Sequence, residues 1–451
     1  MSWEQQQGYP QGQPQDRQQG YQPGYQQGYD YNYGYTYGGY EQPQQYVQQG
    51  YPQQQYTEYP QQPVESVESV EPVQADQTAR LPQVEPEDVP ADAPAEAPEQ
   101  PAEQKPRSPG RDRYFDTLRA VALVRVVTYH TFGWAWCGMV FPSMGIMFAL
   151  AGTLMAKSLE RPPLKVIRSR LRRLLPPFWF WGLFVVLAMM IHGWIPHWQI
   201  VFWIVPFGDP IGNKWGVQAW EILWYLRTYL WFVLLSPLLL KAFRLARIPM
   251  LLLSLAPILV LTFVWAGPEG RLGNELWDFS TYLFCWILGF AHRDGVLQRL
   301  KPALVVLLSA AALAYGGWYA FTHQGEVGTY DLDEIPLAQA FWSAGFVTLL
   351  FWAKARFGID FAWLTRFRRT DRIVTIFNAR AVTIYLWHEI ALILAVPLID
   401  QFWKVRAFEL YLPLESQWFM FGIGWVLIVV SVLACGWVED VAAKKKPRLV
   451  P

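Results

Sequence analysis

An apolar segment at residues 115–137 contains four ionisable side chains, those of Asp116, Arg119, Arg125 and His130. Such side chains are costly inside a membrane, so they indicate function rather than contact with lipid. Asp116 and Arg119 are one helical turn apart and can pair on one face. A helix places Arg119 and His130 on the same side, roughly 16 Å apart along its axis. A neutral imidazole in this position can act as a general base that takes the proton of a hydroxyl group.

The rest of the chain supplies the helices that must position these side chains. A helix needs about 20 apolar residues to cross a bilayer. The sequence therefore predicts an all-α polytopic membrane protein with about ten transmembrane helices in a domain at 111–440. The candidate spans lie at 115–137, 139–157, 175–192, 218–240, 249–266, 275–292, 302–321, 336–355, 376–399 and 417–438.

Loop charge gives this set of spans an orientation. If the N-terminus is cytoplasmic, 26 basic residues of the membrane domain and its ends fall inside and only four fall outside. Cytoplasmic loops carry the excess of Lys and Arg in membrane proteins. We therefore expect a multi-pass protein of the plasma membrane with both termini in the cytoplasm. The lipid bilayer is its first partner.

The ends of the chain differ from the membrane domain. Residues 1–110 are rich in Gln, Tyr, Gly and Pro, then in Pro and Glu, and have 16 acidic against four basic residues. The first 60 residues have almost no aliphatic side chains to form a core, and 63–109 is a Pro/Glu/Ala-rich, self-repelling spacer. The segment is therefore expected to be a disordered cytoplasmic tail. Its Tyr and Gln residues could recruit protein partners, or the tail could be dispensable. Residues 441–451 are predicted to form a basic cytoplasmic tail.

Five motifs resemble, in order, those of the membrane-bound acyltransferase family 3. The first is Phe115–Ala122 (Phe-Asp-Thr-Leu-Arg-Ala-Val-Ala), which is similar to the family's Asp-x-x-Arg-x-x-Ala pattern and is followed by His130 at the family's Arg-x10-His spacing. The other four motifs are Arg170–Pro176, Leu223–Pro237, Ser280–Phe290 and Ala381–His388. The sequence departs from the family pattern in the fourth and ninth spans. Arg227–Tyr229 stands where many members have Ser-Val-Glu, and Ala381 stands at the position of the usual Ser.

The resemblance implies transfer of an acyl group, most simply acetyl, from acyl-coenzyme A to a hydroxyl of a glycan or another small acceptor. Within it, His130 is expected to be the general base. Arg119 is expected to bind the donor or to neutralise the thioester oxyanion, and Asp116 is the catalytic candidate paired with it. Guanidinium groups bind phosphates bidentately, so Arg170 and Arg173 are expected to hold the phosphates of the donor. No metal ion and no nucleic acid is expected to take part. The motifs of the fourth and ninth spans add substrate-side candidates: Trp224, Tyr225, Tyr385 and His388.

Two other classes of function fit the same sequence. Polar residues in a helix bundle are also what a transporter or exporter of a small acidic or glycan-type solute requires. However, the chain contains no internal repeat and no matching pair of broken helices. The second alternative is a membrane scaffold that recruits other proteins through its Tyr/Gln-rich tail.

Overall fold

The computed structural model describes residues 112–449, except for the side chains of residues 214, 215 and 325–327. The predicted tail at 1–110 lies outside these residues, and so do the last two residues of the basic segment at 441–451. Within the described part of the chain every regular element is a helix, which confirms the all-α prediction.

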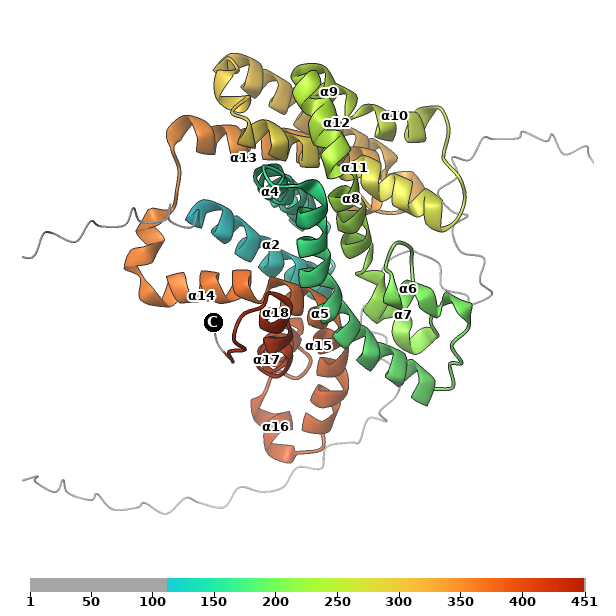
Figure 1. Ribbon diagram of the computed structural model, residues 1–451. Helices are drawn as coiled ribbons and strands as arrows, with labels where there is room; N and C mark the ends of the chain where they lie inside the picture. Colours follow the sequence, from blue (N-terminus) through green and yellow to red (C-terminus); the bar gives the residue numbers. More distant parts are fainter. Residues whose placement is uncertain (1–111, 450–451) are drawn as a thin grey trace, which may run out of the picture. The chain divides into compact units, whose positions relative to one another are not determined.

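Each of the ten predicted spans contains helix. Nine of them correspond to one long helix, and the fifth corresponds to two short ones (Figure 1). The long helices are α2 (Arg113–Phe132), α4 (Ser143–Ser158), α5 (Pro163–Ile191), α8 (Trp224–Leu245), α11 (Arg271–Arg293), α12 (Pro302–Val327), α13 (Pro336–Phe357), α15 (Ala381–Phe402) and α17 (Gln417–Cys435); the short pair is α9 (Arg247–Leu253) and α10 (Ala256–Phe263).

Shorter helices connect these elements. Of those that matter for the site, α7 (Lys214–Glu221) precedes α8 and α14 (Arg368–Ala379) precedes α15. Within 112–449, seven helical segments are long and apolar enough to cross a membrane. Helices α2 and α11 fall outside that set and carry charged residues along their length, and the segment at 247–263 is too short. The remaining connecting helices are α3 (Trp136–Val140), α6 (Val201–Ile204), α16 (Arg406–Tyr411) and α18 (Trp437–Ala442).

Prolines explain two differences from the predicted boundaries. The span expected at 249–266 is broken because Pro257, in the first turn of α10, has no N–H to donate to the preceding turn. The span expected at 175–192 is longer, because α5 already begins at Pro163, a residue suited to a first helical position. The basic residues at 168–173 therefore lie on the same helix as the apolar segment that follows them.

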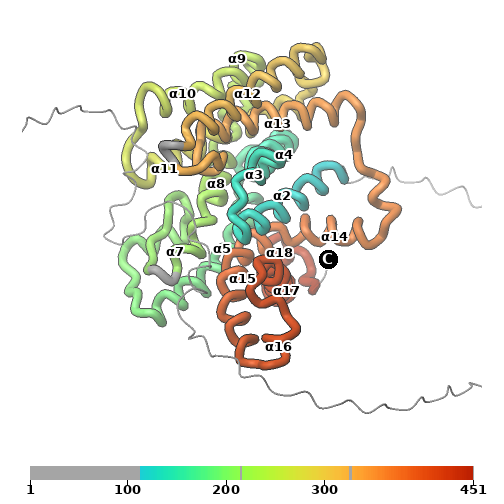
Figure 2. Tube along the Cα trace, turned by 180° about the vertical axis from the view of Figure 1, so that it is seen from behind, coloured from blue at the N-terminus to red at the C-terminus, as the bar shows by residue number. Residues whose placement is uncertain are grey.

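Helix α2 lies between two groups of helices. It packs against α4 on one side and against α14 and α15 on the other, as Figures 1 and 2 show from opposite directions. Helices α4, α8 and α11 share the largest apolar core, which includes Phe148, Phe232 and Trp286. The side chains of α2 are thus held between a rigid core and the helices that follow residue 367.

Candidate active site

The last turn of α2 brings His130 to helix α15. The Nδ1 atom of His130 lies 3.1 Å from Oε2 of Glu389, and the rings of His130 and His388 are 5.1 Å apart between their centroids. Glu389 is buried, whereas the His130 side chain keeps about a fifth of its surface accessible. A carboxylate only accepts hydrogen bonds, so the neutral tautomer of His130 that suits this contact has its proton on Nδ1 and a lone pair on Nε2.

His388 is more deeply buried than His130. Its Nδ1 lies 2.6 Å from the backbone oxygen of Tyr385, one turn earlier in α15. Its Nε2 has no hydrogen-bond partner within residues 112–449. A buried polar atom of this kind is uncommon in proteins and is frequently a functional group. The two histidines and Glu389 therefore form one compact cluster, contributed by α2 and α15.

Aromatic side chains extend this cluster towards α8. The ring of Tyr225 meets that of Tyr385 edge-on at 5.4 Å, and the Tyr385 hydroxyl donates a hydrogen bond to the backbone oxygen of Ile222. Trp224 faces the other way and stacks on Tyr282 of α11 at 5.6 Å. Three predicted substrate-side residues, Tyr225, Tyr385 and His388, are thus brought to His130 in a continuous row.

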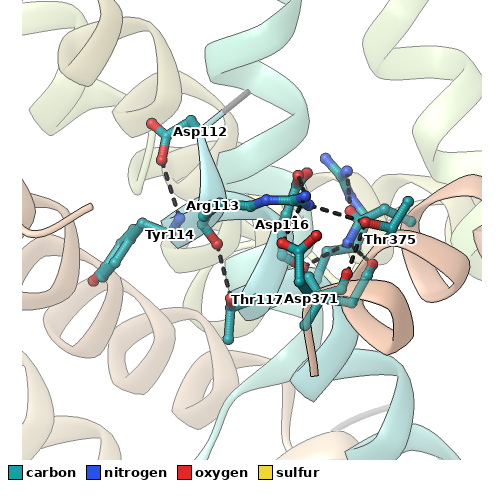
Figure 3. Close-up of polar contacts among 10 residues, drawn as sticks. Asp112, Arg113, Tyr114, Asp116, Thr117, Asp371 and Thr375 are labelled. Atoms are coloured by element: carbon teal, nitrogen blue, oxygen red, sulfur yellow. Dashed lines mark hydrogen bonds and ion pairs between the residues drawn. The ribbon is translucent and has the colours of Figure 1, made fainter. Parts of the chain in front are cut away.

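The opposite end of α2 is fixed by α14. Arg113 contacts Asp371 at 2.7 Å and donates to Thr375, while its neighbour Asp116 lies 3.5 Å away (Figure 3). The backbone oxygen of Asp116 accepts a hydrogen bond from Asn378. These contacts attach the first turns of α2 to one face of α14.

Arg119 joins the same contact. Its Nη1 donates to Oδ1 of Asn378 at 2.7 Å, so a single amide holds both Arg119 and the backbone at Asp116. Arg119 also lies close enough to Tyr225 to interact with it electrostatically. The predicted residues Asp116 and Arg119 therefore lie towards α14, and His130 lies towards α15.

The two arginines predicted to bind the donor differ in their surroundings. Arg170 donates to Oγ of Ser158 at 2.9 Å and to the backbone oxygen of Leu154, so it is anchored to the end of α4. Arg173 is exposed and has no ion pair within the described residues. Arg173 is thus the one of the two whose charge is available to a ligand without breaking an internal contact.

Carboxylates surround the end of α2 that carries His130. Arg125 is bound by Asp333 at 3.2 Å, and the Tyr129 hydroxyl donates to Asp331 at 2.7 Å. Both acids belong to the segment before α13, as does Glu334, whose pKa is raised to about 7 by burial and by the charges of Asp331 and Asp333. The polar end of α2 is thus acidic, in contrast to the arginine-rich end of α5.

Glu389 was not among the predicted site residues, although it follows His388 directly. The sequence offered one signal, a His-Glu pair within an apolar helix, but the partner of the carboxylate turned out to be a histidine some 260 residues earlier. Glu221, in the last turn of α7, was also missed, and it interacts electrostatically with both Glu389 and His130. Nothing in the local sequence around Glu221 indicates this proximity.

The cluster also has the composition of a metal site. His130, His388 and Glu389 each offer one ligand atom, and these atoms lie within 4.8 Å of one another. Two imidazoles and a carboxylate are ligands that Zn²⁺ accepts. The short contact between His130 and Glu389 equally suits a hydrogen-bonded base and its orienting carboxylate. The same three side chains could therefore hold a metal ion or, without one, take part in proton transfer.

Comparison with known proteins gives one match. A family model described as an acyltransferase domain matches residues 112–438, which is most of the chain. No curated protein and no solved structure matches the sequence. The matched region includes every helix that contributes to the cluster around His130.

Proposed function

The chain belongs to the membrane acyltransferase family 3, and from this premise we propose that it transfers an acyl group, most simply acetyl, from acyl-coenzyme A to a hydroxyl of a glycan or other small acceptor. The activity of an integral membrane acyltransferase follows from the family. The donor, the acceptor and the roles of individual residues are our proposal.

The contact between His130 and Glu389 is the observation that supports the proposed mechanism. Glu389 accepts a hydrogen bond from Nδ1–H of His130 and fixes the orientation of the ring. Nε2 of His130 then takes the proton of the acceptor hydroxyl. The hydroxyl oxygen then forms a bond to the thioester carbon, and the carbon–sulfur bond breaks. The coenzyme leaves as a thiolate that recovers the proton from the imidazolium. General base catalysis of this kind contributes about 10²–10⁴-fold to the rate.

The two ends of α2 suit the two ends of the donor. Arg119 and His130 are separated by roughly 16 Å along the helix, so Arg119 does not reach the carbonyl on which His130 acts. An extended pantetheine arm can bridge such a gap, with its thioester at His130 and its phosphates nearer to Arg119. Arg173, which makes no ion pair within residues 112–449, and Arg170 are the proposed phosphate ligands.

The acceptor is proposed to approach from the other end, where polar and aromatic side chains gather. Asp333 keeps about a fifth of its side chain exposed, close to the helix turn that carries His130. Carboxylates accept hydrogen bonds from sugar hydroxyls, and a few convergent polar groups among aromatic rings are typical of ligand sites. A glycan is therefore the preferred class of acceptor. No metal is needed in this mechanism.

Replacing His130 by Ala tests the proposal. We expect turnover in isolated membranes to fall by about 10²–10⁴-fold, with the protein level unchanged. His197→Ala serves as the matched control, because His197 is an exposed histidine outside the cluster. Undiminished acylation by His130→Ala would exclude His130 as the base.

The donor site is tested separately with Arg173→Gln. Because Arg173 makes no ion pair in the described structure, its loss should raise the KM for acyl-coenzyme A and leave kcat and protein level nearly unchanged. Arg170→Gln should do both, raising KM and lowering stability, because it also breaks the contact with Ser158. An unchanged KM in Arg173→Gln would contradict the assignment of the phosphates.

A further inference from the structure

The basic segment of α5 has a second face, which the proposed donor site does not use. Arg168 and Arg172 are four residues apart and therefore lie on the same side of the helix. They line a hollow of about 290 Å³ together with Leu171, Leu175, Pro176 and Trp179. Arg170, in contrast, contacts Ser158 on the side of α4. The two pairs of arginines thus serve different surroundings.

The cations of this hollow have no ion-pair partner among residues 112–449. Arg168 and Arg172 are both exposed, and neither makes an ion pair within the described residues. A second hollow of similar volume, next to Pro163 and Lys241, differs in this respect. One of its two cations, Arg244, is bound by both oxygens of Asp294 at 2.9 and 3.0 Å. Of these two hollows, the one on α5 therefore offers two guanidinium groups side by side that make no ion pair within the described residues.

An exposed apolar track continues from the hollow along the helix. Trp179, Leu183 and Leu187 follow at spacings of four residues, and all three are exposed. Residues at this spacing lie one above the other on the same face. The indole nitrogen of Trp179 donates to the backbone oxygen of Ile204, which fixes the ring at the end of the track nearest to the arginines. The surface is thus cationic at one end and apolar over the next several turns.

We propose that this surface binds one anionic phospholipid in the leaflet on the arginine-rich side. The phosphate lies between Arg168 and Arg172, and an acyl chain lies along Trp179, Leu183 and Leu187. Guanidinium forks bind phosphate oxygens bidentately, and basic pockets beside transmembrane helices favour anionic headgroups. A free phosphate would leave the apolar track uncovered, whereas a phospholipid covers it with an acyl chain. The phosphates of the donor are proposed to bind on the other face of the helix. The inference does not depend on the proposed acyl transfer.

Native mass spectrometry of the purified full-length protein tests this proposal. The protein in detergent is titrated with phosphatidylglycerol or with phosphatidylcholine of the same acyl chains. We expect one phosphatidylglycerol to be retained preferentially. The double variant Arg168→Gln, Arg172→Gln should lose that preference at least several-fold. The double variant Arg299→Gln, Lys301→Gln should keep it, because it removes the same charge from exposed positions away from the hollow.

Three results would overturn the proposal. Equal retention of both lipids, or equal loss in both double variants, would mean that the positive charge of the protein acts without a defined site. Displacement of phosphatidylglycerol by excess coenzyme A would mean that the hollow belongs to the donor. Thermal unfolding of each variant in the same detergent checks the fold. A Leu183→Gln variant, which changes only the apolar track, should weaken retention of phosphatidylglycerol without changing the net charge.

Discussion

At His130 the ring nitrogen that faces Glu389 is Nδ1, which leaves Nε2 for the proton transfer proposed above. Glu389→Gln should lower kcat by at least about tenfold, because an amide can donate to Nδ1 and so favour the wrong tautomer. The KM for the donor should change little, since Glu389 lies at the far end of α2 from Arg119. Steady-state kinetics in detergent or in membranes separate the two parameters.

A matched control substitution distinguishes loss of catalysis from loss of structure. Glu439 is also an acid in contact with α15, where it accepts hydrogen bonds from Thr383. Glu439→Gln should lower stability and leave kcat per folded molecule nearly unchanged. If both variants reduce kcat equally, the orienting role of Glu389 is wrong, and its contribution is to packing alone.

The pKa of Glu334, raised to about 7 from its usual 4.5, makes a second prediction at the scale of a residue. Between these two values the folded protein binds the proton more tightly than the unfolded chain. The free energy of unfolding therefore falls as pH rises from about 4.5 to about 7. Above that range the destabilisation caused by burying the ionised carboxylate is fully present. Glu334→Gln should consequently raise Tm at about pH 8 more than at about pH 5.

Thermal unfolding of the purified protein at the two pH values measures this effect. The control is Glu415→Gln, because Glu415 is exposed on another loop and its removal should have the same small effect at both pH values. A Tm difference for Glu334→Gln that does not vary with pH would contradict the buried, acid-surrounded position of that carboxyl group.

At the scale of elements, close packing of α4 on α11 explains why small residues lie on both helices. A Cβ added to Gly152 would lie 2.3 Å from the backbone oxygen of Trp286, and one added to Gly289 would lie 2.3 Å from that of Ala149. The Thr153 hydroxyl donates across the same contact to the backbone oxygen of Gly289. Small residues permit this approach between membrane helices.

Substitution of these glycines should therefore separate the two helices. Gly289→Ala is expected to destabilise the protein by about 1–3 kcal/mol, because backbone atoms cannot yield as a flexible side chain can. Gly422→Ala in α17 is the control, since a Cβ there meets nothing within 4 Å and Ala favours helix. Thermal unfolding compares the two, and equal stability would show that α4 and α11 tolerate a wider spacing.

The helices could be predicted from the sequence because hydropathy is a local property, and all ten predicted spans contain helix. The positions of α14 and of Glu389 could not. Asn378 contacts Arg119, and Glu389 contacts His130, across some 260 residues, and no spacing along the chain encodes such a contact. The motifs identified His130 and His388 separately, whereas only packing of α2 on α15 brings them together. Helices α14 and α15 are separated at Arg380, whose side chain donates to Asp440 and to the backbone oxygen of Arg448, again across a long stretch of sequence.

At the scale of the whole molecule, the end of α2 that carries Arg119 lies on the side of the basic loops, and the end that carries His130 lies on the opposite side. Arg119 and the arginines of α5 belong to the ends that are rich in basic residues. Near the other end of α2, which carries His130, Arg125 and Tyr129 contact Asp333 and Asp331. If the basic side is cytoplasmic, the proposed donor would enter from the cytoplasm and its acyl group would reach the proposed acceptor from the outer side. This direction of transfer is a consequence of the proposed orientation, and it makes the orientation worth testing directly.

Labelling of single cysteines in intact cells tests that orientation. In a variant without Cys137, Cys285 and Cys435, a cysteine in place of exposed Glu415 should react with a membrane-impermeant maleimide from outside. A cysteine in place of Lys446 should react only after the cells are opened. The physical reason is that 26 of 30 basic residues outside the hydrophobic spans would otherwise face the outer side, against the usual bias. Labelling of Lys446→Cys in intact cells would show that the protein has the opposite orientation. The proposed donor arginines would then lie on the outer side, where no cytoplasmic coenzyme could reach them.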